Sequence, residues 1–243
     1  MDTKTVGLFI LAIIISFFGG FYLANTLNKS ELEALKAAKN PPAASPQNAS
    51  EQTLSPEEIR QRLAEADADP GNIEFQRKLG MALYDYASMK QDVKLLFDVS
   101  RLLTRVNEKN PTDTKVEITL GNLYFDIGYF QKDNESLKKA QQIYQKILAR
   151  TPDDVDVRTD FGLTYFLQNP PEDDKASAEF MKSLEKDPKH EKALQFLIQT
   201  LIKQEKTREA ETYLTRLKEV NPNTPSLSDI QAQMKREENS SPQ

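Results

Sequence analysis

The sequence has no cysteine and no tryptophan, and His190 is its single histidine. The absence of cysteine excludes disulfide bonds, thiolate zinc sites and cysteine nucleophiles. One histidine leaves few metal-binding or acid–base schemes, and a net charge of −5 argues against a general nucleic-acid binder. Glycine-rich phosphate loops and the G-x-S-x-G and H-E-x-x-H motifs do not occur. We therefore expect a protein that is not an enzyme and that uses no cofactor, metal or small-molecule substrate.

Apolar residues are also few, at 38% of the 243-residue chain, and they are unevenly distributed. One long apolar run covers residues 6–24, in which 15 of 19 residues are apolar and none is charged. As a helix it spans about 28 Å, close to the hydrocarbon thickness of a bilayer. It is longer than the apolar region of a cleaved signal peptide, and no A-x-A cleavage site follows it. We therefore predict a single-pass membrane anchor at residues 1–27, with its helix at residues 6–24.

Two sequence features bear on the orientation of this anchor. Lys4 precedes the apolar run, whereas Lys29, Lys36 and Lys39 follow it. A literal positive-inside rule would place the following domain in the cytoplasm. A short basic tail before an apolar helix, however, resembles an uncleaved signal anchor that sends its C-terminal part outward. We therefore expect an extracytoplasmic or periplasmic domain on a bacterial inner membrane.

Residues 28–54 are predicted to form a polar helix followed by a linker rich in Pro, Ser and Ala. Regular structure resumes at residues 55–58, where Ser at the N-cap, Pro at N1 and Glu at N3 make a capping box. We predict an N-terminal capping helix within residues 55–72. A second capping helix and a tail are expected at residues 225–243.

The rest of the chain has an internal period, marked by prolines in polar surroundings. The gaps between successive prolines are 41, 41, 36 and 34 residues, and the prolines are Pro70, Pro111, Pro152, Pro188 and Pro222. An apolar residue follows nine positions after each of the first four, and glycine comes next in three of them. Such a period is typical of a repeat protein.

This pattern resembles the tetratricopeptide repeat, a 34-residue helix–turn–helix unit. In that family, helix A carries L-G-x-x-Y, helix B carries small and aromatic residues, and a proline closes the unit. The resemblance implies an all-α solenoid of about four repeats, at residues 73–113, 114–154, 155–190 and 191–224. The residues assigned to packing within and between repeats are Leu79, Gly80, Leu120, Gly121, Tyr124, Ala140, Phe161, Gly162, Tyr165, Ala176, Leu197 and Ala210.

Three structural expectations follow from the residue types. Glycine after the leucine should let helices A and B approach closely. The first two units are seven residues longer than the fourth, about two helical turns. We expect this extra length at the N-terminal end of helix B, around Val93–Phe97 and Asn134–Lys139. Residues 169–174 should form a turn, and His190, in a turn between repeats, should be solvated.

The resemblance also implies a concave groove, lined by the A helices, that receives peptides or partner helices. The residues matched to groove positions are Arg77, Met81, Tyr84, Lys115, Asn122, Phe125, Leu163, Phe166, Phe196 and Gln199. The four aromatic residues among them either form an open stripe or pack on the next repeat, and the sequence leaves both arrangements open. A clamp for a C-terminal carboxylate is not expected, because two of its basic positions are Asp156 and Asp160.

Together these features favour a membrane-tethered scaffold or adaptor that binds a protein or peptide and recruits it at the bacterial envelope. Two narrower hypotheses remain open at this point. The first is a component of c-type cytochrome maturation that holds the apocytochrome. The second is a chaperone-like accessory to protein secretion at the envelope. A nucleic-acid partner is not expected under any of the three.

Overall fold

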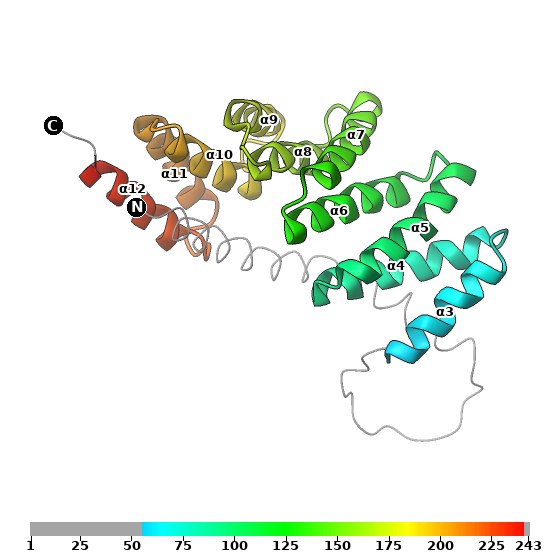
Figure 1. Ribbon diagram of the computed structural model, residues 1–243. Coiled ribbons are helices and arrows are strands. Elements are labelled where there is room, and N and C mark those ends of the chain that lie inside the picture. Colours follow the sequence, from blue (N-terminus) through cyan, green and yellow to red (C-terminus); the bar gives the residue numbers. More distant parts are fainter. Residues whose placement is uncertain (1–54, 241–243) are drawn as a thin grey trace, which may run out of the picture. The chain divides into compact units, whose positions relative to one another are not determined.

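The computed structural model describes residues 55–240, in which all regular structure is α-helical (Figure 1). The predicted anchor and linker, at residues 1–54, lie outside this range. Within residues 55–240, no helix is both long enough and apolar enough to cross a bilayer. The described residues form two compact units that divide between Asp126 and Ile127. The division falls inside helix α6, Thr114–Gln131.

The first unit begins with the predicted capping box. Ser55 accepts a hydrogen bond from the Glu58 backbone, and the Glu58 carboxylate accepts one from the Ser55 backbone at 2.9 Å. The helices before α6 are α3 (Pro56–Ala68), α4 (Ile73–Lys90) and α5 (Val93–Lys109). Helix α3 packs against α4, and α4 pairs with α5. Asp67 at the end of α3 also binds Arg101 and Arg105 of α5. Because Arg101 donates a hydrogen bond to it, the pKa of Asp67 is lower than usual.

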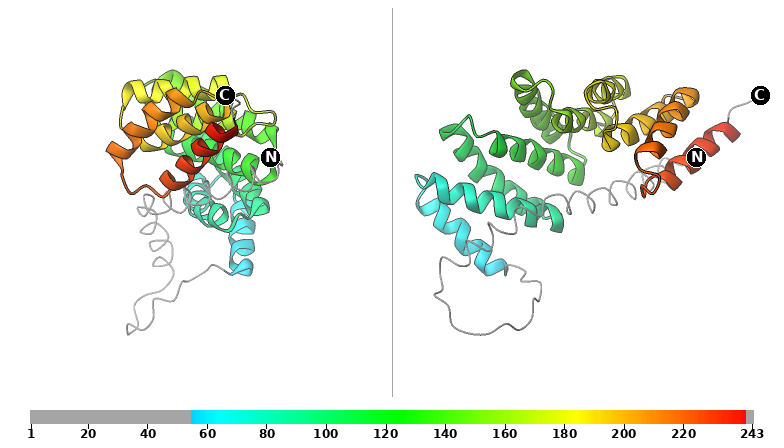
Figure 2. Two further views of the ribbon diagram at one scale, coloured as in Figure 1. Left: turned by 90° about the vertical axis from the view of Figure 1, so that its left-hand side faces the viewer. Right: turned by 180° about the vertical axis from the view of Figure 1, so that it is seen from behind.

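The second unit contains the end of α6 and six further helices (Figure 2). These are α7 (Asn134–Arg150), α8 (Val155–Leu167), α9 (Asp173–Lys186), α10 (Glu191–Lys203), α11 (Thr207–Val220) and α12 (Leu227–Ser240). Each helix from α7 to α10 packs on the next one along the chain. Helix α12 covers α10 and α11, with Ile230 and Met234 buried.

A pair of hydrogen bonds joins the start of α7 to the turn between α8 and α9. The Asn134 side-chain amide donates to the Asn169 carbonyl at 2.8 Å. In return, the Asn169 backbone N–H donates to Asn134 Oδ1 at 3.1 Å. One side chain thus satisfies both backbone groups of a residue 35 positions away.

Each expected repeat range contains two helices, but the extra length of the long repeats is not where it was predicted. Helices α4 and α6 have 18 residues, against 13 in α8 and α10. Helices α5 and α7 have 17 residues, against 14 in α9 and α11. Most of the additional length therefore belongs to helix A, and placing all of it in helix B was wrong. In each long repeat, helix A is longer at its C-terminal end and helix B at its N-terminal end, the two ends that face the turn between them. Both helices are extended because a helical hairpin lengthens only when its two paired helices lengthen together.

Two glycines of the L-G pattern lie where a side chain would not fit. A Cβ built on Gly80 would come within 2.6 Å of Leu103 on α5. A Cβ on Gly162 would come within 2.7 Å of the Phe180 ring on α9. The expected close approach of helices A and B is confirmed at both positions. Gly128, which the pattern did not mark, has the same role near the end of α6, where its Cβ would lie 2.7 Å from Leu137.

Three hairpin turns contain a non-glycine residue in the left-handed region. These are Gln91, Lys132 and Glu205, with φ values of 53°, 54° and 58°. A side chain there costs about 1 kcal/mol relative to glycine. We expect each single change to glycine to raise the free energy of unfolding by about 0.5–1 kcal/mol, as measured by urea denaturation. Glycine at exposed Lys78, inside helix α4, should instead lower it by a similar amount. Destabilisation by glycine at all three turns would contradict the expectation.

Candidate protein-binding surface

The ten predicted groove residues lie on helices α4, α6, α8 and α10, and we call this set the A-helix face. Lys115 is exposed, and Arg77 and Asn122 are half-buried. The remaining seven are buried: Met81, Tyr84, Phe125, Leu163, Phe166, Phe196 and Gln199. The polar members on α4 and α6 are thus the accessible ones.

In the first unit, polar contacts fix the side chains of α4. Arg77 Nε donates to Asp113 Oδ2 at 2.7 Å, which ties α4 to the turn before α6. Although partial burial opposes ionisation, the hydrogen bond from Arg77 holds the pKa of Asp113 below its usual value. The Tyr84 hydroxyl donates to Asp126 Oδ2 at 3.1 Å, and Ser88 Oγ donates to the same oxygen at 2.6 Å. The tyrosine is therefore oriented by α6.

In the second unit, aromatic packing involves the A-helix residues Phe166 and Phe196. The Phe196 ring on α10 lies edge-on to Phe166 of α8, with centroids 5.6 Å apart, and 6.1 Å from the Phe180 centroid. Lys203 Nζ lies 3.7 Å from the Phe166 centroid, a cation–π contact. Gln199 Nε2 is buried and has no hydrogen-bond partner among the described residues. In this unit the aromatic side chains join the third repeat to the fourth.

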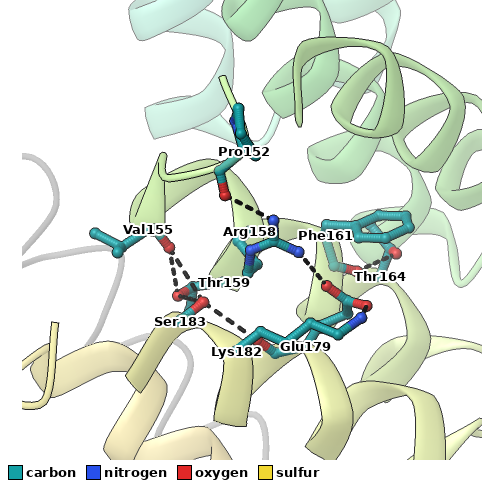
Figure 3. Close-up of polar contacts among 9 residues, drawn as sticks. All are labelled: Pro152, Val155, Arg158, Thr159, Phe161, Thr164, Glu179, Lys182 and Ser183. Carbon is teal, nitrogen blue, oxygen red and sulfur yellow. Dashed lines mark hydrogen bonds and ion pairs between the residues drawn. The ribbon is translucent and has the colours of Figure 1, made fainter. Parts of the chain in front are cut away.

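A polar cluster between α8 and α9 holds the third hairpin together (Figure 3). Arg158 donates to Glu179 Oε2 at 2.9 Å and to the Pro152 carbonyl at 2.7 Å. The Arg158 and Glu179 side chains are only 16% and 12% exposed. Lys182 also binds Glu179, at 2.7 Å. The helix that presents Leu163 and Phe166 is therefore fixed by a largely desolvated ion pair.

His190 was expected to be solvated, and this is wrong. Its side chain is 13% exposed at the start of α10, with Nε2 3.7 Å from Asp156 Oδ1. Burial lowers the pKa of His190 below its usual value, against an opposing effect of Asp156. The turn between the third and fourth repeats brings the His190 ring close to Asp156 of α8. The polar residues around His190 in the sequence do not reveal this contact.

This burial gives a pH dependence with a definite sign. The unfolded chain takes up a proton on His190 near its usual pKa of about 6.5, whereas the folded chain takes it up only at lower pH. Stability should therefore fall as the pH drops below about 6.5. We expect His190→Gln to lose less stability than the wild type between about pH 7.5 and pH 5.5, measured from urea unfolding. Equal losses of unfolding free energy in the variant and the wild type would contradict a lowered pKa of His190 in the folded protein.

Two contributors to this surface were missed in the sequence. Asp126 is 1% exposed and accepts from two hydroxyls on α4. Nothing in one sequence marks it, although Tyr84 and Ser88 are one helical turn apart and so share a face. Lys203 could have been assigned to this surface from the sequence, because it follows Gln199 by four positions and Phe196 by seven. Residues at these spacings lie on the same face of a helix.

Comparison with known proteins agrees with this architecture. A solved structure of MamA is 22% identical over 68% of this chain and 87% of its own, with a TM-score of 0.53. MamA from Desulfovibrio magneticus RS-1 is 19% identical over 70% and 87%, with a TM-score of 0.50. TTC0263, a thermophilic TPR protein in Thermus thermophilus, is 15% identical over 74% and 88%, with a TM-score of 0.51.

These likenesses concern the fold, because all three identities are low. No curated protein matches the sequence. The sequence profile of the tetratricopeptide repeat family matches residues 174–234, from α9 to α12. The helical hairpins, the family match over residues 174–234 and these likenesses together show a fold of tetratricopeptide-repeat type.

Proposed function

We propose that this protein is a non-enzymatic adaptor that binds another protein on its A-helix face and holds it at a bacterial membrane. The observation that carries the proposal is the succession of helical hairpins of tetratricopeptide type. Such repeats contact mainly their neighbours, which leaves surface on each repeat for a partner. The described residues present this face as packed aromatics with polar side chains around them.

The polar side chains around the A-helix face indicate what kind of partner fits. Glu74, Lys115 and Asp156 are exposed and differ in sign. Two further cations are already neutralised, Arg77 by Asp113 and Lys192 by Asp160. A partner whose charges are all of one sign would gain little electrostatic binding energy from such a surface. A peptide or an amphipathic helix of mixed polarity is the better match.

The membrane part of the proposal is supported by the sequence before the described residues. Residues 6–24 have the length and composition of a single bilayer span. Within the segment 28–54, the linker at residues 40–54 would extend about 20–23 Å as a flexible chain. That distance is sufficient to hold the repeats beside the headgroups. We place the repeats on the extracytoplasmic side, as the signal-anchor character of the N-terminus favours.

Site-specific photo-crosslinking in native membranes tests this proposal. A crosslinking amino acid at Lys115, on the A-helix face, should give discrete adducts with a partner protein. The matched control is Glu108, which is also exposed but lies on α5 in the same unit. Adducts from Lys115 alone are expected, and identical adducts from both positions would contradict binding on this face. Deletion of residues 1–27 should move the protein from the membrane to the soluble fraction, and retention would contradict the tether.

A further inference from the structure

Large apolar side chains are exposed at the turn that joins α4 to α5. Met89 is the penultimate residue of α4 and Phe97 the fifth residue of α5, and they are 46% and 45% exposed. We call residues 89–97 the α4–α5 tip. Only one other large apolar residue is comparably exposed in the described part of the chain, Met181 on α9, at 41%. Two such residues within nine positions indicate a local contact surface.

The repeat pattern shows that the fold does not require an aromatic at Phe97. Phe97 lies 14 residues before the closing proline of its repeat. The residues at the same distance in the other three repeats are Lys138, Asp174 and Arg208. All three are charged, as expected for an outward-facing position of helix B. An apolar ring at a position that is otherwise charged serves a contact outside the repeat stack.

The α4–α5 tip also presents two lysines without partners among the described residues. Lys90 and Lys94 are exposed and form no ion pair in this part of the chain. Nearby carboxylates are engaged, since Asp92 caps α5 through the Leu95 N–H and Asp98 lies 3.5 Å from Arg101. Asp92 keeps its negative charge in this cap, so residues 89–97 combine their apolar side chains with a net charge of +1.

The surroundings of Met181 differ from those of the α4–α5 tip. Lys182 beside it is paired with Glu179, and Lys186 is paired with Asp153. An exposed apolar residue among neutralised lysines has no attraction for an anionic surface. Met181 is therefore a useful reference but not a second candidate.

The connection to the N-terminal segment places the α4–α5 tip on a particular side of the first unit. The chain enters this unit at Ser55, and α3 then runs toward the α3–α4 turn. Helix α4 runs back in the opposite direction, so the beginning of α3 lies toward the α4–α5 tip (Figures 1 and 2). The linker at residues 40–54, at about 20–23 Å as a flexible chain, is slightly shorter than α4.

From these observations we infer that the α4–α5 tip docks on the anionic phospholipid surface beside the anchor. Met89 and Phe97 enter the headgroup region, and Lys90 and Lys94 contact lipid phosphates. The inference rests on the membrane tether proposed above, and it adds that the first repeat is oriented on the bilayer rather than suspended from it. Basic and apolar side chains together are the combination that binds such interfaces.

The natural absence of cysteine allows a direct test in the full chain. A fluorophore sensitive to lipid-borne quenchers is attached to Gln91→Cys, with Glu205→Cys as the matched control. Both residues lie at hairpin turns with positive φ. In discs of phosphatidylglycerol we expect strong quenching at position 91 only. In neutral discs, or with Lys90→Gln and Lys94→Gln added, occupancy of the quenched state should fall about tenfold.

The outcomes separate this inference from the tether itself. If the chain inserts into the discs but position 91 is quenched no more than position 205, the inference is overturned and the tether stands. If the chain does not insert, both are overturned. Phe97→Ser provides an independent measurement, because the residue is exposed and its change should leave the helical signal unaltered. Undiminished quenching in that variant would also count against docking by the tip.

Discussion

Gly162→Val should lower the free energy of unfolding of the second unit by about 3 kcal/mol. The Cβ alone would lie 2.7 Å and 2.9 Å from two atoms of the Phe180 ring, and 3.3 Å from Glu179 Cβ. Phe180 is fully buried and also contacts Phe196, so it has no free space into which to move. The helices α8 and α9 must therefore separate. Urea unfolding followed by circular dichroism measures the effect.

The control for this variant is Gly71→Ala, in the turn before α4. The nearest atom to a Cβ there is Asp69 Oδ1 at 3.5 Å, an ordinary contact. Its unfolding free energy should stay within about 0.5 kcal/mol of the wild type. A Gly162→Val protein as stable as the control would show that the hairpin can open at no cost, and the packing explanation of the L-G pattern would fail.

Glu179→Ala is the second change for which we expect a large effect, a loss of about 3 kcal/mol. The variant leaves Arg158 in a largely desolvated position, where the Pro152 carbonyl is its one remaining acceptor among the residues drawn in Figure 3. An unpaired charge in such a place is strongly unfavourable. Urea denaturation again gives the comparison.

Two variants distinguish a buried-charge effect from simple loss of a side chain. Lys182→Ala removes the other partner of Glu179, but Lys182 is 52% exposed, so the loss should be below about 0.5 kcal/mol. The double change Arg158→Met with Glu179→Leu should recover much of the stability, since no charge is left buried. Equal losses in Glu179→Ala and Lys182→Ala would argue against the ion pair.

Much of the hairpin architecture could be predicted because its determinants are local in sequence. Helix B ends two residues before the closing proline in every repeat, at Lys109, Arg150, Lys186 and Val220. Proline has no N–H for the helix and disfavours α conformation in the residue before it. The capping box at Ser55 is equally local. Such features can be recognised without knowing what lies across the core.

Features that depend on contacts between distant residues could not be predicted in the same way. The division of the extra length between α4 and α5 was missed, because Ala87 and Leu96 are both buried and a helical period fits either side of the turn. The burial of His190 depends on Asp156 and α8 behind it. Whether the aromatics of the A-helix face are open or packed depends on ring geometry, as between Phe166 and Phe196.

The reciprocal hydrogen bonds between Asn134 and Asn169 have a consequence for hydrogen exchange. The Asn169 N–H belongs to an exposed turn, and in an ordinary loop it would exchange with solvent almost as fast as in an unfolded peptide. Here it exchanges only when the first turn of α7 releases the Asn134 side chain. Its protection factor should therefore follow that of the α7 N-terminus, so that two segments 35 residues apart open as one unit.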